Sequence, residues 1–566
     1  MKDALYIHDQ TAVINFSAFF PQSADEILSH ESFKHFLDLY LSKLSSKEPK
    51  RYAWILQGKS QKQALIDLVR FLKLVLVLDL SEIDHPLLHD KTQLTYLIED
   101  AYNEWRTLQR ISILKVSSSN SGQVTNFMDA DSRYNALVLT LYRGIQEKVQ
   151  GTKNRVYRQL QAGTNASMVL KDVKWTQPTG YEYLKGIPFV DQLLLRTPLL
   201  LHPKSNKRSG SFQPVTENPL KNIEINREQY FCYPAKVGEL LILVYVHYDH
   251  AFSGISNANL FELANKEEIL HSKIDGIMIF GYEDGSDSTV YHYDEKNDLW
   301  TAKVSYNDKI SYFGYMKKMM LTMHNAIMMK KGHLPIHGSM INVQFKDREP
   351  IGVVFVGDSG AGKSETIEAI QLLGHQDLVG MDVIFDDMGS FLIENGKVLA
   401  QGTEIGAFIR LDDLDKGSPY RTMDRSIFMN PESPNNARVI IPVASYENIV
   451  KKHPVHYFFY ANNYVNQTGF KVVKYASDIK DVFVEGKRMA MATTHETGIS
   501  TTYFANPFGP MQDQKTCDPL LDQYFKALDE SHVKTGEVYT GLGVKDSVEN
   551  HLSLTAQAIL EELLKN

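Results

Sequence analysis

Residues 357–364 have the types and the spacing of a loop that binds phosphate. An apolar run, Val353 to Val356, precedes them and an amphipathic helical pattern follows, which is the strand–loop–helix context that such a loop requires. In this context backbone N–H groups surround phosphate oxygens at a helix N-terminus, the lysine reaches the β and γ phosphates, and the last serine joins a Mg²⁺ shell. We therefore predict binding of a nucleotide or polyphosphate, with Mg²⁺, by the G-x-x-x-x-G-K-[ST] segment Gly357-Asp358-Ser359-Gly360-Ala361-Gly362-Lys363-Ser364.

Several further segments on both sides of this loop carry residues that could serve metal binding or phosphoryl transfer. Upstream, Tyr312 and the pair Lys317-Lys318 begin a methionine-rich helical pattern, and a histidine lies shortly before the phosphate-loop strand. Downstream are an aspartate where a second strand should end, an arginine in an apolar run and a late aromatic segment. In chain order these segments are Tyr312 to Lys318, Leu334 to Ser339 with His337, Leu378 to Asp382, Asn435 to Pro442 with Arg438, and Tyr503 to Gly509.

Taken together, the segments resemble the ATP-dependent phosphoenolpyruvate carboxykinases. That family carries a Y-x-x-x-M-K-K helix start, an H-x-S element before the phosphate loop and G-D-D after it, then N-x-R-x-x-Y-P and a late F-G segment. The order and the approximate spacing agree over residues 311–510. The spelling GDSGAGKSE of the loop itself is more similar to the HPr kinase family, whose nucleotide core is similar.

The resemblance implies that the nucleotide is ATP, and it implies roles for individual residues. Lys318, His337 and Asp382 would ligate Mn²⁺, which suits a mixed lysine, histidine and carboxylate shell. A lysine binds metal only when neutral, so its pKa must be lowered by burial and by a nearby cation, which Lys317 offers. Arg438 would lie beside the transferred phosphoryl group and Tyr312 near the substrate carboxylate. The catalytic set is therefore predicted to be Lys318, Lys363, Arg438, Tyr312 and Asp382, with Lys318, His337, Asp382 and Ser364 as metal ligands; Glu404 and Arg410 fall near an acidic and a basic position of the family.

The sequence also departs from the family pattern. Met381 replaces the first aspartate of the paired acidic motif, Ile441 stands where the family has a tyrosine, and Thr497 stands where it has an arginine near the nucleotide. The substrate-arginine motif R-S-P-x-D-K has no clear counterpart. Its closest spelling is Arg196-Thr197-Pro198.

The pattern of apolar residues predicts an α/β protein in three parts. Helical patterns cover about 24–115 and 127–170, separated by a polar stretch at 117–122, and short apolar strand patterns follow from 240 onward. The stretch from Ile310 to Lys331 is helical, with methionines that we expect to fill the core. We predict a mostly helical N-terminal region at 1–116, an α/β substrate-side domain at 124–310 and a carboxykinase-like domain at 311–566, whose mixed sheet carries the phosphate loop. The basic segment from His202 to Ser211 is expected to be a solvated surface turn.

Composition narrows the possible partners. The 566 residues are 43% hydrophobic and 23% charged, which is typical of globular proteins, and the net charge of −8 offers no general attraction to nucleic acid or to an anionic membrane. The N-terminus lacks a signal-peptide pattern. Charged residues interrupt the most hydrophobic segment, Leu68 to Leu80, which is too short to span a bilayer. We predict a cytoplasmic protein, with a monomer favoured, whose partners are a nucleotide and a small-molecule substrate. Cys232 and Cys517 are expected to be buried thiols.

Three functions remain open from the sequence. The first is a lyase that converts oxaloacetate and ATP to phosphoenolpyruvate, CO₂ and ADP. The second is a kinase acting on a hydroxyl of a protein or metabolite, in which Asp382 would be the base. The third is a nucleotide-binding regulator without catalysis. The lyase requires Arg196 or another arginine within reach of Lys318 and His337.

Overall fold

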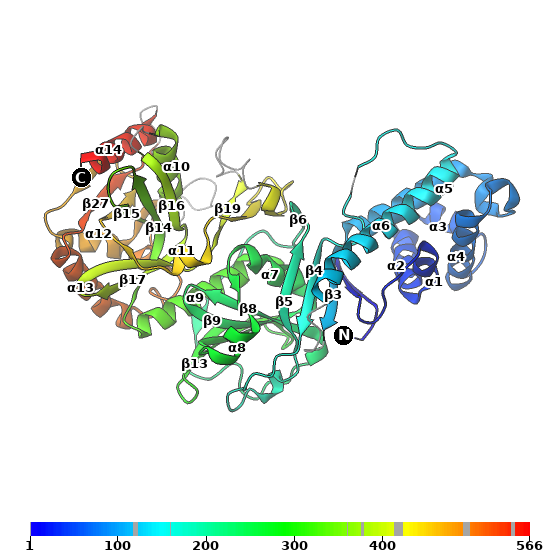
Figure 1. Cartoon of the computed structure of the whole chain (residues 1–566), viewed down its shortest axis with the longest axis horizontal. Coiled ribbons are helices and arrows are strands. Elements are labelled where there is room, and N and C mark those ends of the chain that lie inside the picture. The colour runs from blue at the N-terminus through cyan, green and yellow to red at the C-terminus, as the bar shows by residue number, and fades with distance from the viewer. Residues whose placement is uncertain are drawn as a thin grey trace.

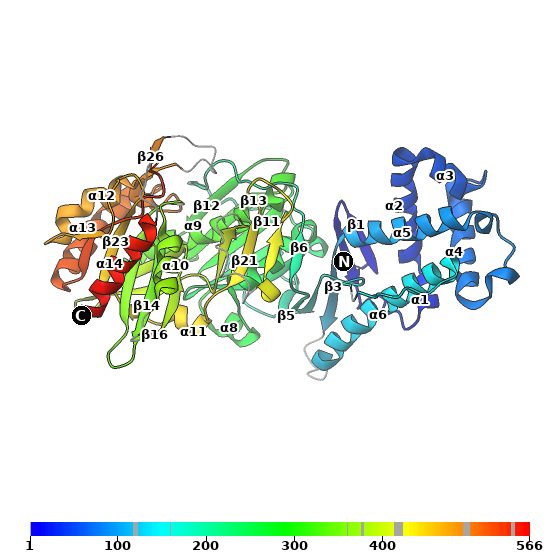
Figure 2. The same ribbon diagram turned by 90° about the horizontal axis from the view of Figure 1, so that it is seen from above.

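The structure, a computed structural model, shows a mixed α/β protein that is elongated (Figures 1 and 2). The N-terminal helices lie at one end and the phosphate loop with the C-terminal helices lies at the other, with a large sheet between them. The described residues are 2–116, 123–158, 160–358, 360–374, 378–411, 423–490, 498–544 and 550–565.

Helices dominate the N-terminal region, but less completely than the apolar pattern predicts. The helical stretch expected to reach residue 115 ends at Thr107, and the one expected to reach 170 ends at Gln150. The last part of each predicted helical stretch is instead a strand, β3 (Gln109–Val116) in the first stretch and β4 (Ala166–Lys171) in the second. Both are strands because their apolar residues pack into the core around the first large sheet. Short apolar runs do not distinguish strand from helix by period alone. The helices are α1 (Ala24–Ser29), α2 (Glu31–Lys47), α3 (Pro49–Leu56), α4 (Gln61–Val77), α5 (Lys91–Thr107) and α6 (Gln123–Gln150).

The first large sheet joins the N-terminal region to the strand-rich middle of the chain. Strands from both sides of residues 117–122 lie side by side in it, since β3 pairs with β4 in parallel. The strand patterns expected from residue 240 onward include the antiparallel pair β12 and β13. The order is β1 (Leu5–His8), β2 (Thr11–Asn15), β3, β4, β5 (Phe189–Leu195), β8 (Tyr230–Val237), β9 (Leu240–His247), β11 (Gly276–Tyr282), β13 (Leu299–Ser305), β12 (Thr289–Asp294) and β7 (Gln213–Pro214), with β10 (Glu262–Leu263) on β8.

The second large sheet carries the phosphate loop. Its central strand β14 (Leu334–Phe345) runs antiparallel to β15 (Ile351–Val356), while β15, β23 (Tyr457–Asn462) and β27 (Lys534–Tyr539) are parallel. Helices α10 (Lys363–Leu373) and α14 (His551–Lys565) pack together beside it, as Figure 2 shows. The other strands are β22 (His453–Pro454), β18 (Lys397–Gly402), β17 (Met388–Glu394), β24 (Phe470–Val472) and β16 (Leu378–Phe385), which pairs with β14.

Helix α9 (Gly314–Lys330) lies between the two large sheets. It contacts β8 and β13 of the first sheet and β14 and β17 of the second. Burial from both sides explains why the helix is apolar around its circumference, and its six methionines (Met316, Met319, Met320, Met323, Met328 and Met329) are buried, as predicted. The lysine pair at its start is therefore held between the two halves of the core.

A small sheet ties the middle region to the C-terminal region. It contains β19 (Gly406–Arg410), β21 (Arg438–Pro442), β20 (Ile427–Met429) and β6 (Leu199–Leu201), in that order. Because β6 comes from the middle of the chain, this sheet fixes the segment after Leu201 against the strands that carry Arg438. The two cysteines are free and buried, as predicted. Within the described ranges, no helix has both the length and the apolar character needed to cross a membrane.

Candidate active site

The phosphate loop lies where the sequence predicts it, between β15 and the N-terminus of α10. Its glycines are required by the backbone path: Gly360 and Gly362 have φ angles of +80° and +96°, which L side chains rarely adopt. A Cβ on Gly362 would lie 2.6 Å from a carbon of Thr540, and one on Gly357 would lie 2.8 Å from the Cβ of Ala361. Ser359 lies outside the described residues.

Lys363 is folded over the loop. Its ammonium group donates hydrogen bonds to the carbonyl oxygens of Gly357 (2.7 Å) and Asp358 (3.2 Å), and the side chain is nearly buried. The Asp358 carboxylate in turn accepts hydrogen bonds from Arg488 Nε and Thr502 Oγ1, both at 3.1 Å. The loop is thus anchored through Asp358, and the lysine ammonium is held against the carbonyl oxygens at the start of the loop.

Two adjacent aspartates follow β16 and join the phosphate loop to the lysine pair. Oδ1 of Asp386 accepts hydrogen bonds from the hydroxyl groups of Ser364 (3.0 Å) and Ser339 (3.2 Å). Burial raises the pKa of Asp386, and the neighbouring Asp387 raises it further. The hydroxyl of Ser364 and the Asp386 carboxylate are hard oxygen ligands at the helix N-terminus, the kind of pair that Mg²⁺ prefers.

Asp387 is the centre of a second cluster. Its Oδ2 lies 2.7 Å from Lys317 Nζ and 2.5 Å from Lys318 Nζ, and its Oδ1 lies 3.1 Å from His337 Nε2. Burial alone would raise the pKa of Asp387, but the two lysines outweigh burial and hold this pKa well below its usual range. Burial lowers the pKa of Lys318 to about 8; Asp387 opposes this shift and Lys317 adds to it. The lowering predicted for Lys318 is therefore present in the structure, with the two causes expected.

His337 faces Asp387 through a nitrogen that carries no proton in the neutral ring. The other nitrogen, Nδ1, is 2.5 Å from the carbonyl oxygen of Ala505; because a carbonyl only accepts, Nδ1 carries the proton. Nε2 of neutral His337 and the Asp387 carboxylate are then two facing acceptors, which attract a proton or a metal cation between them. Phe504 and Ala505 both have φ angles of +49°, so a strained turn holds the carbonyl in place.

A third acidic group, Glu404, lies on the other side of Lys317. Its Oε1 is 3.0 Å from Lys317 Nζ, and both side chains are buried. Burial raises the pKa of Glu404 to about 7, against the opposing effect of Lys317. Burial also lowers the pKa of Lys317, but Asp387 and Glu404 outweigh burial and raise it above its ordinary value. Lys317 is therefore a permanent cation of this cluster.

The ring of Phe408 lies close to Lys317 and to two other residues predicted from the sequence, Arg438 and Tyr312. The ring of Phe408 is 5.7 Å from Lys317 Nζ and 5.3 Å from Arg438 Cζ, and it lies 5.9 Å from the ring of Tyr312. Arg438 Nε is buried without a hydrogen-bond partner among the described residues. The structure thus brings Arg438 and Tyr312 to the same part of the molecule as the lysine pair.

Arg208, an arginine that the sequence analysis did not select, lies beside the ring of Phe508. Lys318 Nζ is 4.5 Å from its centroid, the His337 ring is 5.9 Å away, and Arg208 Cζ is 5.7 Å away. The segment from His202 to Ser211, predicted to be a solvated surface turn, alternates between exposed and half-buried residues, and Arg208 is one of the half-buried residues and faces the site. Its signal in the sequence is the spelling Arg208-Ser209, which matches the first two letters of R-S-P-x-D-K.

The loop that carries Arg208 is fixed by contacts on both sides. Asn206 Nδ2 donates to Ser433 Oγ (3.0 Å), and Asn430 Nδ2 donates to the carbonyl oxygen of Pro203 (2.9 Å). The backbone N–H of Ser209 donates to the hydroxyl of Tyr315 on α9 (3.1 Å). These contacts link the arginine to the helix that carries the lysine pair.

The structure corrects the position of the acidic ligand. Asp382 lies exposed within β16, where its Oδ2 accepts a hydrogen bond from Gln344 Nε2 (2.5 Å). It precedes Asp386 by four residues, about 13 Å along a strand. Gly380-Met381-Asp382 keeps the glycine of the G-D-D motif, but Phe385-Asp386-Asp387 keeps its acidic pair. The strand continues to Phe385, so Asp387 meets Lys318 and His337 and Asp382 does not.

Arg196 is also separate from this cluster. Its guanidinium pairs with the buried carboxylate of Asp131, which also accepts hydrogen bonds from Thr164 and Ser167 at 2.5 Å. This network links α6 to β4 and serves the first sheet. Thr497, at the position where the family has a nucleotide arginine, lies outside the described residues.

Comparison with known proteins does not identify a family for this chain, so a function has to be argued from the geometry of the site. Neither the family models nor the curated proteins that were searched match this chain. In the described part of the chain, no three histidine, cysteine, aspartate or glutamate side chains gather as a metal site. The cluster at Asp387 offers two such groups, His337 and Asp387, and a lysine of lowered pKa in place of the third.

Proposed function

We propose that this chain is a metal-dependent carboxykinase that converts oxaloacetate and ATP to phosphoenolpyruvate, CO₂ and ADP. One observation carries the proposal: two adjacent aspartates connect the phosphate loop to the lysine–histidine cluster. Asp386 bonds the loop serine Ser364, and Asp387 contacts Lys318 and His337. A nucleotide site is thereby next to a second charged site that a simple phosphate-loop ATPase does not need.

The donor sets on the two sides suit two different cations. Ser364 and Asp386 would hold Mg²⁺ beside the nucleotide, and Lys318, His337 and Asp387 would hold Mn²⁺. The facing acceptors of His337 and Asp387 fit a cation, and a lysine with a pKa of about 8 reaches the neutral form at modest cost. When bound, such a metal supplies Lewis-acid stabilisation of negative charge that develops on a substrate oxygen.

The side chains around the cluster match the charges of the proposed substrate. Oxaloacetate carries two carboxylates, and Arg208 and Lys317 offer fixed positive charge near Phe508 and Phe408. Breaking the bond to the departing CO₂ leaves its electron pair on the remaining enolate. The enolate oxygen then attacks the γ phosphorus of ATP, and ADP leaves. Lys363 and Arg438 would stabilise the loosened phosphoryl oxygens during this transfer.

A kinase acting on a hydroxyl group is the second candidate, favoured by the spelling of the loop. Such a reaction uses a carboxylate base near the acceptor hydroxyl. Asp387 is a poor base because the lysine pair keeps its pKa low, and Asp386 is already bonded to two serines. The low pKa of Asp387 therefore favours the carboxykinase, whereas Asp386, whose pKa is raised by burial, is the carboxylate that a kinase would use as its base.

The deciding experiment runs the reaction in the direction of carboxylation. The purified chain receives phosphoenolpyruvate, ADP, bicarbonate and Mn²⁺, and oxaloacetate is followed by its reduction with malate dehydrogenase and NADH. We expect turnover that requires ADP and bicarbonate. Binding of a fluorescent ADP analogue without any oxaloacetate formation would reject the carboxykinase and leave the kinase or the regulator.

Arg208 gives a sharper test of the substrate. We expect Arg208→Ala to raise KM for phosphoenolpyruvate at least tenfold, since a charge-assisted contact of roughly 1.5–3 kcal/mol is lost. Lys207→Ala is the matched control, because Lys207 is the exposed neighbour of Arg208 on the same loop. Equal KM values in the two variants would contradict the assigned role.

A further inference from the structure

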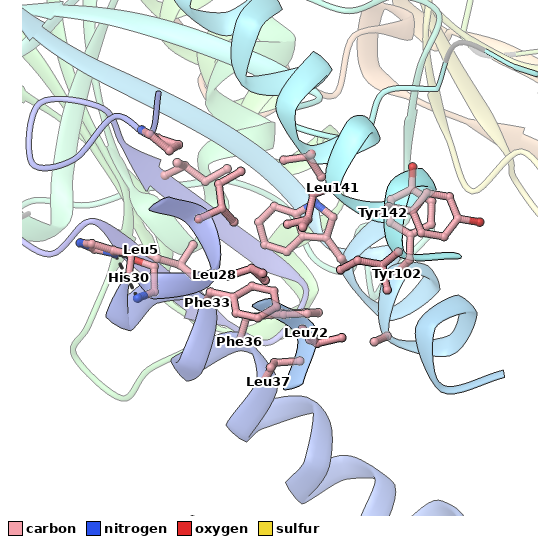
Figure 3. Close-up of a pocket in the computed structure, with 18 of the residues that line it drawn as sticks. Leu5, Leu28, His30, Phe33, Phe36, Leu37, Leu72, Tyr102, Leu141 and Tyr142 are labelled. Carbon is pink, nitrogen blue, oxygen red and sulfur yellow. Dashed lines mark hydrogen bonds between the residues drawn. The ribbon is translucent and has the colours of Figure 1, made fainter. Parts of the chain in front are cut away.

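A large apolar cavity lies in the N-terminal helical region, far from the phosphate loop. It has a volume of about 170 Å³ and is enclosed by α1, α2, α4, α5 and α6 together with residues near β1 and β2. Figure 3 shows its lining, with Leu5 and His30 at one end of the labelled residues and Tyr102 and Tyr142 at the other. We propose that this cavity binds one uncharged, mainly hydrocarbon small molecule.

The chemistry of the lining excludes a charged ligand. None of the residues that line the cavity is aspartate, glutamate, lysine or arginine. Three of its polar side chains are engaged within the protein: His30 Nδ1 pairs with Ser32, the Tyr142 hydroxyl donates to Glu99 (2.8 Å), and Trp105 Nε1 donates to the carbonyl of Ala162 (2.6 Å). The buried hydroxyl of Tyr102 has no hydrogen-bond partner among the described residues, so one neutral polar group is left to face a ligand. A buried charge without a partner is strongly unfavourable, so hydrocarbon chains and ring faces are what the site can contact.

The size of the cavity sets the size of the ligand. Protein interiors are close-packed, with few voids larger than a water molecule. An engineered apolar cavity of about 150 Å³ in another protein stays dry and binds benzene. A cavity of about 170 Å³ therefore has room for one aromatic ring or a short hydrocarbon chain.

The cavity is also accessible without unfolding of the helices. Several lining residues, among them Leu5, Phe33 and Ile98, are only partly buried, so the cavity opens toward the surface. Figure 1 places this region at the opposite end of the molecule from α10. The inference is consequently independent of the proposed carboxykinase function, whose substrates are anions.

The first test uses ¹⁹F NMR to measure binding of fluorobenzene, an uncharged probe with a single aromatic ring, to the full chain. We expect saturable binding of one probe per chain. Ala101→Phe inserts a ring from α5 into the cavity and should weaken this binding at least tenfold. Ala53→Phe is the matched control, since Ala53 is exposed on α3 and does not line the cavity, and its affinity should equal that of the wild type.

Two further measurements test ligand binding in the cavity if Ala101→Phe fails to fold. Val138→Phe fills the same cavity from α6, with folding checked by circular dichroism. In the wild type, toluene should displace the probe at least tenfold more effectively than benzoate, a charged ring of similar size. Absence of saturable binding, equal affinity in a folded filling variant and in Ala53→Phe, or equal displacement by toluene and benzoate would each overturn the proposal.

Discussion

Replacing Asp387 by asparagine should destabilise the core between the two large sheets. The substitution preserves shape but removes the negative charge that lies 2.7 Å from Lys317 Nζ and 2.5 Å from Lys318 Nζ. Coulomb's law with an effective dielectric constant near 20 gives about 6 kcal/mol of attraction for each lysine. Desolvation offsets much of this attraction, and removing one partner of a buried ion pair typically costs about 3–5 kcal/mol. We expect a loss in this range for Asp387→Asn, with Glu404 still compensating Lys317.

Asp382→Asn provides a matched control on β16, the strand that leads to Asp387. Asp382 is exposed and, among the described residues, its carboxylate accepts a side-chain hydrogen bond from Gln344, so its replacement should change stability by no more than about 0.5 kcal/mol. The pair of variants thus compares two aspartates that lie five positions apart. The comparison also distinguishes Asp387, which lies beside Lys318 and His337, from Asp382, the metal ligand predicted from the sequence.

Hydrogen exchange of the amides in α9 and β14 measures this effect where it occurs. A loss of about 3–5 kcal/mol would accelerate exchange of the most protected amides roughly 150- to 5,000-fold. Titration with Mn²⁺ is a separate measurement, and we expect weaker binding only in Asp387→Asn. Equal protection in the two variants would refute the electrostatic argument, and lost Mn²⁺ affinity in Asp382→Asn would refute the assignment of Asp387.

Other predictions concern the phosphate loop and two buried histidines. Lys363→Ala should abolish binding of a fluorescent ADP analogue while leaving the circular dichroism spectrum unchanged, because the hydrogen bonds that its ammonium donates to described residues go to loop carbonyls; retained nucleotide affinity would contradict the loop assignment. Gly362→Ala should also abolish nucleotide binding, since its Cβ would clash at 2.6 Å, whereas Gly374→Ala, also at positive φ but with no atom of the described residues within 4 Å of its Cβ, should retain it. Burial lowers the pKa of His324 to about 4 and of His250 to about 3. The unfolded chain protonates these groups near pH 6.5, so stability is complete above that pH and falls below it by about 1.4 kcal/mol per pH unit for each histidine, or about 3 kcal/mol in total at pH 5.5. Equal melting temperatures at pH 7.5 and 5.5 would show that these histidines are not buried in the neutral form.

Local patterns in the sequence were sufficient for the elements that depend on nearby residues. The phosphate loop needs glycine at fixed offsets, a strand before it and a helix after it, and all of these lie within about twenty residues. The hairpin of β12 and β13 and the buried helix α9 follow equally from turn residues and apolar content. The strands β3 and β4 were mistaken for helix because short apolar runs carry no decisive period.

The composition of the site, in contrast, was decided by the tertiary structure. Lys318, His337, Asp387 and Arg208 come from a helix, two strand ends and a surface loop, and no local rule relates their positions. Whether residue 382 or 387 meets the lysine depends on where β16 ends against β14, a register set by pairing between strands about forty residues apart. Arg208 reaches Phe508 only because β6 joins the small sheet beside β20. Local residue types specify which chemistry each segment could perform, but long-range pairing and burial decide which segments meet and shift the pKa values on which that chemistry depends.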